Sequence, residues 1–381
     1  MGNSNSKSHT CPIPSSAQPL SIHGTAHKPL SLIAAACAIL TLVSALALAT
    51  LHLTRYRAPK EQRQIIRILF APFIFAVVAW GGIADYDIAA YIDPIGDVYE
   101  SFCLCALFLL YIQFAAPRTT FGEEMFKAME HAATVTDAKG GAWARLSWIY
   151  VFQFPLTELL SVIVLEATMA TGSYCESSLS PRFGHVWVMI ISTLGVVLAM
   201  MSIFRFYKRT KPVMKARRGL AKLVCFKGIV FLRFIQTWVF GILIDKNVLH
   251  HSKQFSYADL LYGIPNVLIA VEMLFFSASF WYAYAAGEYS AHAKPNEGSL
   301  NFFRAAVDAA NPSDLVFGIL RIFNVFTEMR YASLPKENDH NIPLTETYGG
   351  GFVDGAADEY HSNGGHGRRG LGGRRGRRQR Y

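Results

Sequence analysis

Several of the long apolar runs in this sequence contain ionisable or amide side chains. A charged side chain at the centre of a bilayer costs about 2.5–3.5 kcal/mol on insertion scales, so such groups usually face protein or water. Glu158 and Glu166 are eight residues apart, and Arg233 and Gln236 are three apart, so each pair shares one face of a helix. The complete set comprises Glu100, Glu158, Glu166, Lys227, Arg233, Gln236, Asn266 and Glu272.

Two arrangements would satisfy these groups. In the first, they surround a polar cavity between the spans, and Arg233 attracts an anionic group of a solute. In the second, Arg233 pairs with Glu158 or Glu272, while Lys227 and Glu166 reach the lipid headgroups. The number of such residues favours the cavity. We expect the route to be lined or supported by Glu100, Glu158, Arg233, Gln236, Asn266 and Glu272, and its cytoplasmic mouth by Arg67 and Lys227.

The elements that must position these residues are seven apolar runs. The chain is 52% hydrophobic and 17% charged, and its apolar residues come in blocks rather than at amphipathic periods. Each run is long enough to cross a hydrocarbon core of about 30 Å as a helix, which satisfies the backbone internally. The sequence predicts an all-α membrane protein with spans at 30–53, 65–83, 95–114, 148–170, 186–204, 223–244 and 260–286, within one domain at 30–289.

The charges of the short loops predict the orientation. Lys and Arg within about 15–20 residues of helix ends stay on the cytoplasmic side. The first, third and fifth loops carry sixteen of these residues, and the second, fourth and sixth carry three. The second loop contains Asp85, Asp87 and Asp93 and no basic residue. We therefore expect the N-terminus outside and the C-terminus in the cytoplasm.

The N-terminal tail, residues 1–29, is rich in Ser, Pro, Asn and Gly and is predicted to be disordered. Its first residues match the N-myristoylation pattern with Gly2 as the acceptor, and Cys11 could carry a second acyl chain. Acylation of Gly2 takes place in the cytosol and conflicts with an outside N-terminus. We favour the loop charges, which draw on many residues. With that orientation Cys11 and Cys175 both face the oxidising side, where a disulfide could join them.

Two amphipathic cytoplasmic helices are predicted within residues 299–330, broken at Asn311-Pro312. The second has a wide apolar face and either lies on the inner membrane surface or packs under the bundle. Residues 334–381 lose their apolar content and end in a Gly/Arg-rich, polybasic stretch that is predicted to be disordered. Such a tail near a bilayer meets lipid headgroups most simply, and no nucleic-acid partner is expected.

The sequence contains no motif of a familiar catalytic site. It has no Gly-x4-Gly-Lys-Ser/Thr phosphate loop, no His-Glu-x2-His zinc helix and no Gly-x-Ser-x-Gly nucleophile elbow. We therefore do not expect an enzyme, a metal site or a cofactor.

Four stretches together resemble the organic solute transporter alpha family, also called the transmembrane protein 184 family. They are PKEQRQIIRILF at 59–70, YID at 91–93 followed by DVYESF at 97–102, the junction from the Lys-Pro pair at 211–212 to Gln236, and VEMLFF at 271–276. The resemblance extends from about residue 30 to residue 289. This chain departs from the pattern in lacking cysteine in its third loop and in having Phe154-Pro155 where the family often has Lys-Pro.

The resemblance implies seven spans with an outside N-terminus and passive transport of amphipathic, anionic or sterol-like organic solutes, with a small single-span beta subunit. The other partners that we expect are membrane lipids and a second copy of the chain, in a plasma, endosomal or vacuolar membrane. One alternative is a non-transporting seven-helix receptor or scaffold that acts in endomembrane trafficking through its basic tail. Another is remodelling of endosomal or vacuolar membranes through the surface helix and that tail.

Overall fold

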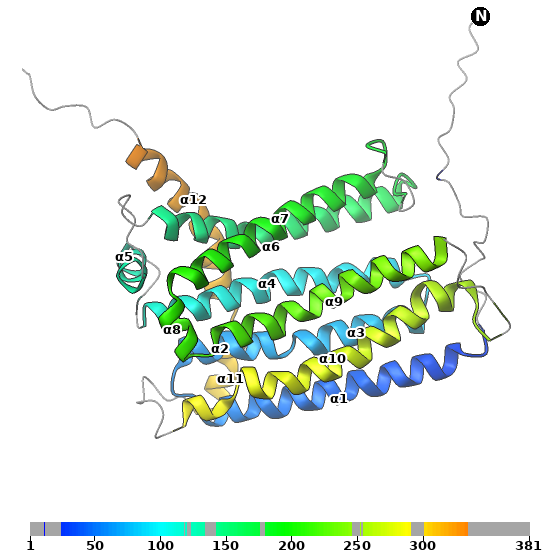
Figure 1. The fold of residues 1–381 in the computed structure, drawn as a ribbon, viewed down its shortest axis with the longest axis horizontal. Coiled ribbons are helices and arrows are strands. Elements are labelled where there is room, and N and C mark those ends of the chain that lie inside the picture. The colour runs from blue at the N-terminus through cyan, green and yellow to red at the C-terminus, as the bar shows by residue number, and fades with distance from the viewer. Residues whose placement is uncertain are drawn as a thin grey trace, which may run out of the picture. The chain divides into compact units, whose positions relative to one another are not determined.

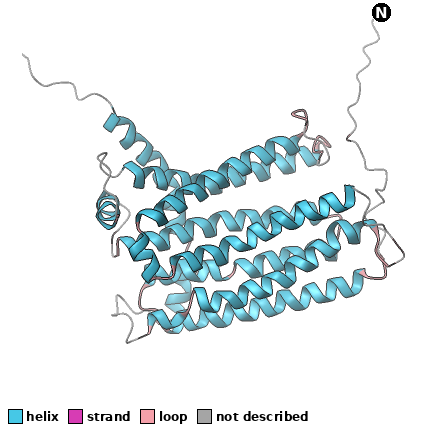
Figure 2. Ribbon diagram, in the orientation of Figure 1, coloured by secondary structure: helices cyan, strands magenta, loops and turns pink. Residues whose placement is uncertain are grey.

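The computed structural model describes Cys11 and residues 24–117, 119, 123–133, 142–175, 180–245, 252, 254–290 and 301–333. All regular elements in this part of the chain are helices, and it contains no strand (Figure 2). Among the described residues, seven helical segments are long and apolar enough to span a membrane: His27–Thr54, Pro59–Ala84, Ala89–Ala115, Ala142–Ala170, Gly184–Arg209, Gly219–Phe240 and Asp259–Tyr289. The predicted all-helical, seven-span class is therefore confirmed. Most of the two predicted tails, and Gly2 with them, lies outside the described residues.

The spans are built from α1 (His27–Thr54), α2 (Pro59–Leu69), α3 (Ala71–Ala84), α4 (Ala89–Ala115), α6 (Ala142–Ala170), α7 (Gly184–Arg209), α9 (Gly219–Asp245) and α10 (Ile264–Ala283). The second span is broken at Phe70, because Pro72 cannot continue the helical hydrogen bonds of α2. The second and third spans begin six residues before the apolar runs at 65 and 95. The early start of α4 places Asp93 inside a helix, where the sequence suggested a loop.

Shorter helices complete the fold: α5 (Glu123–Ala132), α8 (Lys211–Ala216), the π-helix η1 (Asp259–Gly263), the 3₁₀-helix η2 (Ala286–Tyr289), α11 (Phe302–Ala310) and α12 (Ser313–Ser333). The break between α11 and α12 falls at Asn311 and Pro312. Trp148 of α6 donates a hydrogen bond from Nε1 to the Gly318 carbonyl at 3.0 Å, which attaches α12 to the bundle. Five large apolar side chains of α12 are exposed: Val316, Phe317, Leu320, Phe323 and Phe326.

The spans pack as two groups around α4. In one group α6 lies along α7, and in the other α1, α3 and α10 pack on one another with α9 along α10 (Figure 1). The close approach of α6 to α7 favours glycine at 195, because a Cβ there would clash with the side chain of Thr157. Between the two groups, α4 contacts α2, α3 and α6 and is buried along residues 103–112. The first turns of α4 are less buried, with Asp93 exposed and Asp97 partly exposed.

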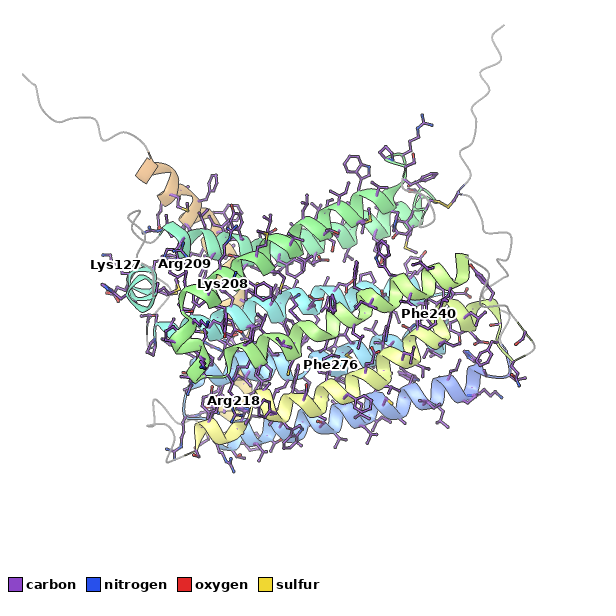
Figure 3. All side chains as sticks on the ribbon, in the orientation of Figure 1. Lys127, Lys208, Arg209, Arg218, Phe240 and Phe276 are labelled. Atoms are coloured by element: carbon purple, nitrogen blue, oxygen red, sulfur yellow. A yellow bond between two sulfur atoms is a disulfide. The ribbon has the colours of Figure 1, made fainter. Side chains whose placement is uncertain are left out.

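The two ends of the bundle differ in charge. Lys127, Lys208, Arg209 and Arg218 lie at the end where α1 stops and α2 begins, which we call the basic end (Figure 3). The opposite end, where α3 stops and α4 begins, carries Asp85 and Asp87 and is called the acidic end. At the acidic end Cys11 forms a disulfide with Cys175, which follows α6, and their Cα atoms are 5.6 Å apart.

Candidate functional site

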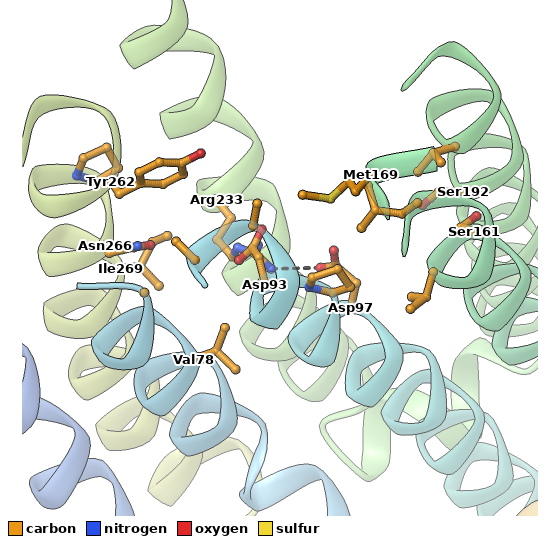
Figure 4. Close-up of a pocket in the computed structure, with 18 of the residues that line it drawn as sticks. Val78, Asp93, Asp97, Ser161, Met169, Ser192, Arg233, Tyr262, Asn266 and Ile269 are labelled. Atoms are coloured by element: carbon orange, nitrogen blue, oxygen red, sulfur yellow. Dashed lines mark hydrogen bonds and ion pairs between the residues drawn. The ribbon is translucent and has the colours of Figure 1, made fainter. Parts of the chain in front are cut away.

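A polar cavity of about 360 Å³ lies in the acidic half of the bundle, between α6 and α7 on one side and α3, α4, α9 and α10 on the other (Figure 4). Apolar residues such as Val162, Leu165 and Ile269 form much of its wall. The hydrophilic side chains that line it are Asp93, Asp97, Glu158, Ser161, Tyr174, Ser192, Arg233, Tyr262 and Asn266.

Arg233 of α9 joins two carboxylates of α4 in the wall of the cavity. Its Nη1 donates to Asp97 Oδ1 at 2.8 Å and its Nη2 to Asp93 Oδ1 at 2.9 Å. Because Asp93 and Asp97 are four residues apart, they present both acceptors on one face of α4. The guanidinium also lies 5.0 Å from the centre of the Phe75 ring. The arginine side chain is 15% exposed, whereas that of Asp93 is 53% exposed, so Asp93 is the partner that water or a ligand can reach most easily.

A second ion pair lies one layer deeper between the same two helices. Lys227 Nζ donates to Glu100 Oε1, and the Glu100 side chain is only 5% exposed. Lys227 precedes Arg233 by six residues, and Glu100 follows Asp93 by seven, so the two pairs are stacked along α4 and α9. Lys227 therefore lies in an ion pair between α4 and α9, and its place near the cytoplasmic mouth of a route stays a prediction.

Glu158 of α6 brings a third carboxylate to the polar cavity, from the wall opposite α9. Ser192 of α7 donates a hydrogen bond from Oγ to Glu158 Oε1 at 2.7 Å, and Glu158 is 4% exposed. Glu158 is therefore not the partner of Arg233. Three carboxylates and one guanidinium line the polar cavity, so its lining has a net negative charge if all four groups are ionised.

The remaining predicted residues divide between three places. Asn266 of α10 lines the polar cavity. Gln236 and Glu272 bond to each other between α9 and α10, where the Gln236 amide donates to Glu272 Oε1, and neither lines the polar cavity. Glu272 thus also has a partner other than Arg233. Arg67 lies in the basic half of the bundle and bonds to Asp314 at the start of α12, with Nη2 2.8 Å from Oδ1.

The Arg67–Asp314 pair in the basic half of the bundle is part of a buried network. Arg63 Nη1 lies 3.3 Å from Asp308 Oδ1 of α11, and Arg63 Nε lies 3.4 Å from Asp314 Oδ2. Burial by itself would raise the pKa of Asp314, but the hydrogen bond and charge of Arg67, helped by Arg63 and Gln64, hold that pKa below its ordinary value. This network attaches both α11 and α12 to α2.

Asp93 and Asp97 are the site residues that sequence reasoning missed. The signal was available, because Asp93, Asp97 and Glu100 recur at intervals of four and three and so share a helix face. It was hidden because the apolar run that marks the third span starts only at residue 95. Among the residues that the structure describes, no group of three His, Cys, Asp or Glu side chains is placed to hold a metal ion.

A family model described as organic solute transporter Ostalpha matches residues 30–289, a range that contains the whole polar cavity. The chain belongs to the Ostalpha family. A transmembrane protein 184 homolog of Dictyostelium discoideum is 24% identical over 273 residues, which cover 65% of this chain and 51% of that relative. The chain thus spans about half the length of this curated relative. No solved structure matches this Ostalpha family chain.

Proposed function

We propose that this Ostalpha family protein is a passive transporter that carries amphipathic organic solutes across a membrane through the polar cavity. The observation that carries the proposal is the group of Asp93, Asp97, Glu158 and Arg233 around one cavity within a bundle of apolar helices. Ionisable residues inside membrane spans are costly, and those that face a cavity within the bundle are typical of solute and ion pathways. Family membership supports the transport of an organic solute in particular.

The polar cavity has both charged and apolar walls, and this combination suits an amphipathic solute. The volume of about 360 Å³ falls within the usual range of small-molecule sites. A polar end group would bind among the charged residues of α4, α6 and α9, while an apolar body would lie against Val162, Leu165 and Ile269. We propose a sterol-like or other lipid-like body, because these walls offer it apolar contacts.

The charge of the polar cavity bears on the polar end of the solute. An anionic group, which Arg233 alone would attract, must displace Asp93 or Asp97 from the guanidinium. A hydroxyl or amine group can instead donate hydrogen bonds to the carboxylates that already line the cavity. We therefore propose that solutes with a neutral or cationic donor group are carried faster than matched anions, which revises the preference that the sequence suggested.

Flux through vesicles tests the proposal. Purified protein is incorporated into phosphatidylcholine vesicles, with labelled sterol probes that carry a hydroxyl, an amine or a sulfate group. We expect protein-dependent flux that stops when the gradient is abolished and that is slowest for the sulfate. Flux equal to that of protein-free vesicles, both with this chain alone and with a co-purified single-span subunit, would contradict the transport proposal; a fastest sulfate probe would contradict only the charge preference.

A matched pair of variants locates the route. Glu158→Gln removes one cavity carboxylate, whereas Glu166→Gln makes the same change two turns further along α6, at a residue that does not line the polar cavity. We expect slower flux in the first variant and unchanged flux in the second. Equal flux in both would place the route elsewhere.

We also propose that the acidic end faces the outside or a lumen and that the basic end faces the cytoplasm. Disulfides form and persist in oxidising compartments, which supports this orientation for the Cys11–Cys175 bond. A sulfur in that bond cannot carry an acyl chain, so the disulfide competes with acylation of Cys11. After mild reduction of cells that carry the protein in the plasma membrane, a membrane-impermeant thiol reagent should label Cys175 without permeabilisation, and labelling of this plasma-membrane protein only after permeabilisation would reverse the orientation.

A further inference from the structure

A second cavity, of about 470 Å³, lies in the basic half of the bundle between α1, α2, α4 and α11. We call it the apolar cavity, and its walls include Ala49 and Leu53 of α1, Phe70 after α2, Phe102 of α4 and Ala306 of α11. None of the residues of the polar cavity contributes to it. We propose that the apolar cavity binds one acyl chain of a phospholipid from the surrounding bilayer.

The position of the mouth determines what can enter. Leu46 of α1 lines the apolar cavity and is also 47% exposed, so the cavity reaches the outer surface of α1. That surface continues along the helix through Val43, Leu40 and Ile39, which are all exposed and apolar. Because α1 is a membrane span, the medium at this surface is lipid hydrocarbon. An acyl chain can therefore enter from the side without crossing a polar barrier.

Three polar groups of the lining are already bonded to other parts of the protein, and the remaining one, Thr50, is on the exposed surface of α1. The Tyr99 hydroxyl donates to the Arg67 carbonyl at 2.7 Å, and Cys103 Sγ lies 3.7 Å from the same oxygen. The Arg67 guanidinium bonds to Asp314. These three groups therefore need no hydrogen bond from water or from a sterol. The hydroxyl of a sterol, in contrast, needs a hydrogen-bond partner when it is buried. An acyl chain brings no polar group into this space.

An empty space of this size would be unfavourable. Atoms that line a void lose the dispersion contacts that a filled interior provides, and water does not fill an apolar cavity that offers it no hydrogen bonds. A flexible acyl chain can follow the irregular outline between an α-helical wall of alanines and the rings of Phe70 and Phe102. The bound chain would contact α1 and α11 together, and so would help to hold α11 against the bundle.

Photolabelling tests the assignment on the full chain. The protein is placed in phosphatidylcholine nanodiscs that contain a phosphatidylcholine with a diazirine near the end of one acyl chain, and labelled peptides are mapped by mass spectrometry. We expect labelling of both α1, over 46–53, and α11, over 302–310. Ala306→Trp fills the apolar cavity and should abolish most of this labelling, whereas Val307→Trp, at a 70% exposed neighbour that does not line the cavity, should leave it unchanged.

Two further measurements make the outcome decisive. Native mass spectrometry should show one retained phospholipid on the unmodified protein and on Val307→Trp, and its loss on Ala306→Trp; if that variant does not elute as a folded protein, Ala306→Leu replaces it. Unlabelled phospholipid should compete with the labelling, and sterol should not. Labelling that is indifferent to the residue at 306, or competition by sterol in place of phospholipid, would overturn the proposal. Neither result depends on whether the polar cavity transports a solute.

Discussion

The two cavities of this protein lie in opposite halves of the same bundle and differ in how their polar groups are satisfied. In the polar cavity, charged side chains of α4 and α9 pair with each other in the wall, and Asp93 remains half-exposed. At the apolar cavity, the charged groups of α2, α11 and α12 are paired in a buried network, in which Arg67 of the wall bonds to Asp314, and most of the other lining residues are apolar. The first arrangement leaves ligand-accessible charge and the second removes it, which suits the first to solute passage and the second to a resident hydrocarbon chain.

The largest effect is expected at the base of the polar cavity. Lys227→Met leaves Glu100 as an unpaired, buried carboxylate, and removing one partner of a buried pair costs about 3–5 kcal/mol. Thermal unfolding in detergent should show this loss. The double variant Glu100→Gln with Lys227→Met leaves no unpaired charge and should recover most of the stability. Equal losses in the single and double variants would mean that the unpaired charge of Glu100 is not the source of the loss.

A smaller and more local effect is expected beside the apolar cavity. Asp314→Asn removes a buried charge that accepts hydrogen bonds from Arg67 and Gln64, at a cost of about 1.5–3 kcal/mol. The loss should appear as faster hydrogen exchange of α12, while the helices around the polar cavity stay protected. Uniformly faster exchange in both halves would show that the two regions are one cooperative unit.

Acid should have the same local effect. Because the folded-state pKa of Asp314 is lowered, its contribution to stability is fully present above the unfolded pKa of about 3.9 and is lost as the pH falls through the lower folded value. Exchange of α12 should therefore be constant from neutral pH to about pH 5, once the intrinsic pH dependence of exchange is removed, and should rise below about pH 4. Asp314→Asn should show the raised exchange already at neutral pH and less further change on acidification.

The smallest effect concerns a single neutral hydrogen bond in the wall of the apolar cavity. Tyr99→Phe removes the bond to the Arg67 carbonyl and should cost about 0.5–1.5 kcal/mol. Tyr91→Phe, on the same helix at a side chain that is 46% exposed, serves as the control and should change little. A Tyr99→Phe protein as stable as the control would show that water or another donor replaces the hydroxyl.

Sequence reasoning identified the spans because a membrane helix satisfies its own backbone, so its existence depends only on a local run of apolar residues. It also identified Glu158, Arg233 and Asn266, which line the polar cavity, since ionisable and amide residues stand out against such runs. It did not find the partners of Arg233, because these depend on how α4 and α9 are rotated toward each other. The sequence placed Cys11 and Cys175 on one side of the membrane and left their disulfide as a possibility, because the distance between residues 164 positions apart depends on the packing of the helices.

The sequence by itself determined that this chain is a seven-helix membrane protein with costly polar groups in its spans. Only the tertiary structure decided that Arg233 meets Asp93 and Asp97, that Gln236 and Glu272 turn toward each other, and that one cavity is polar and the other apolar. The physical reason is that a span is fixed by short-range hydrogen bonds and the thickness of the bilayer, whereas a cavity is the space left when separate helices have packed.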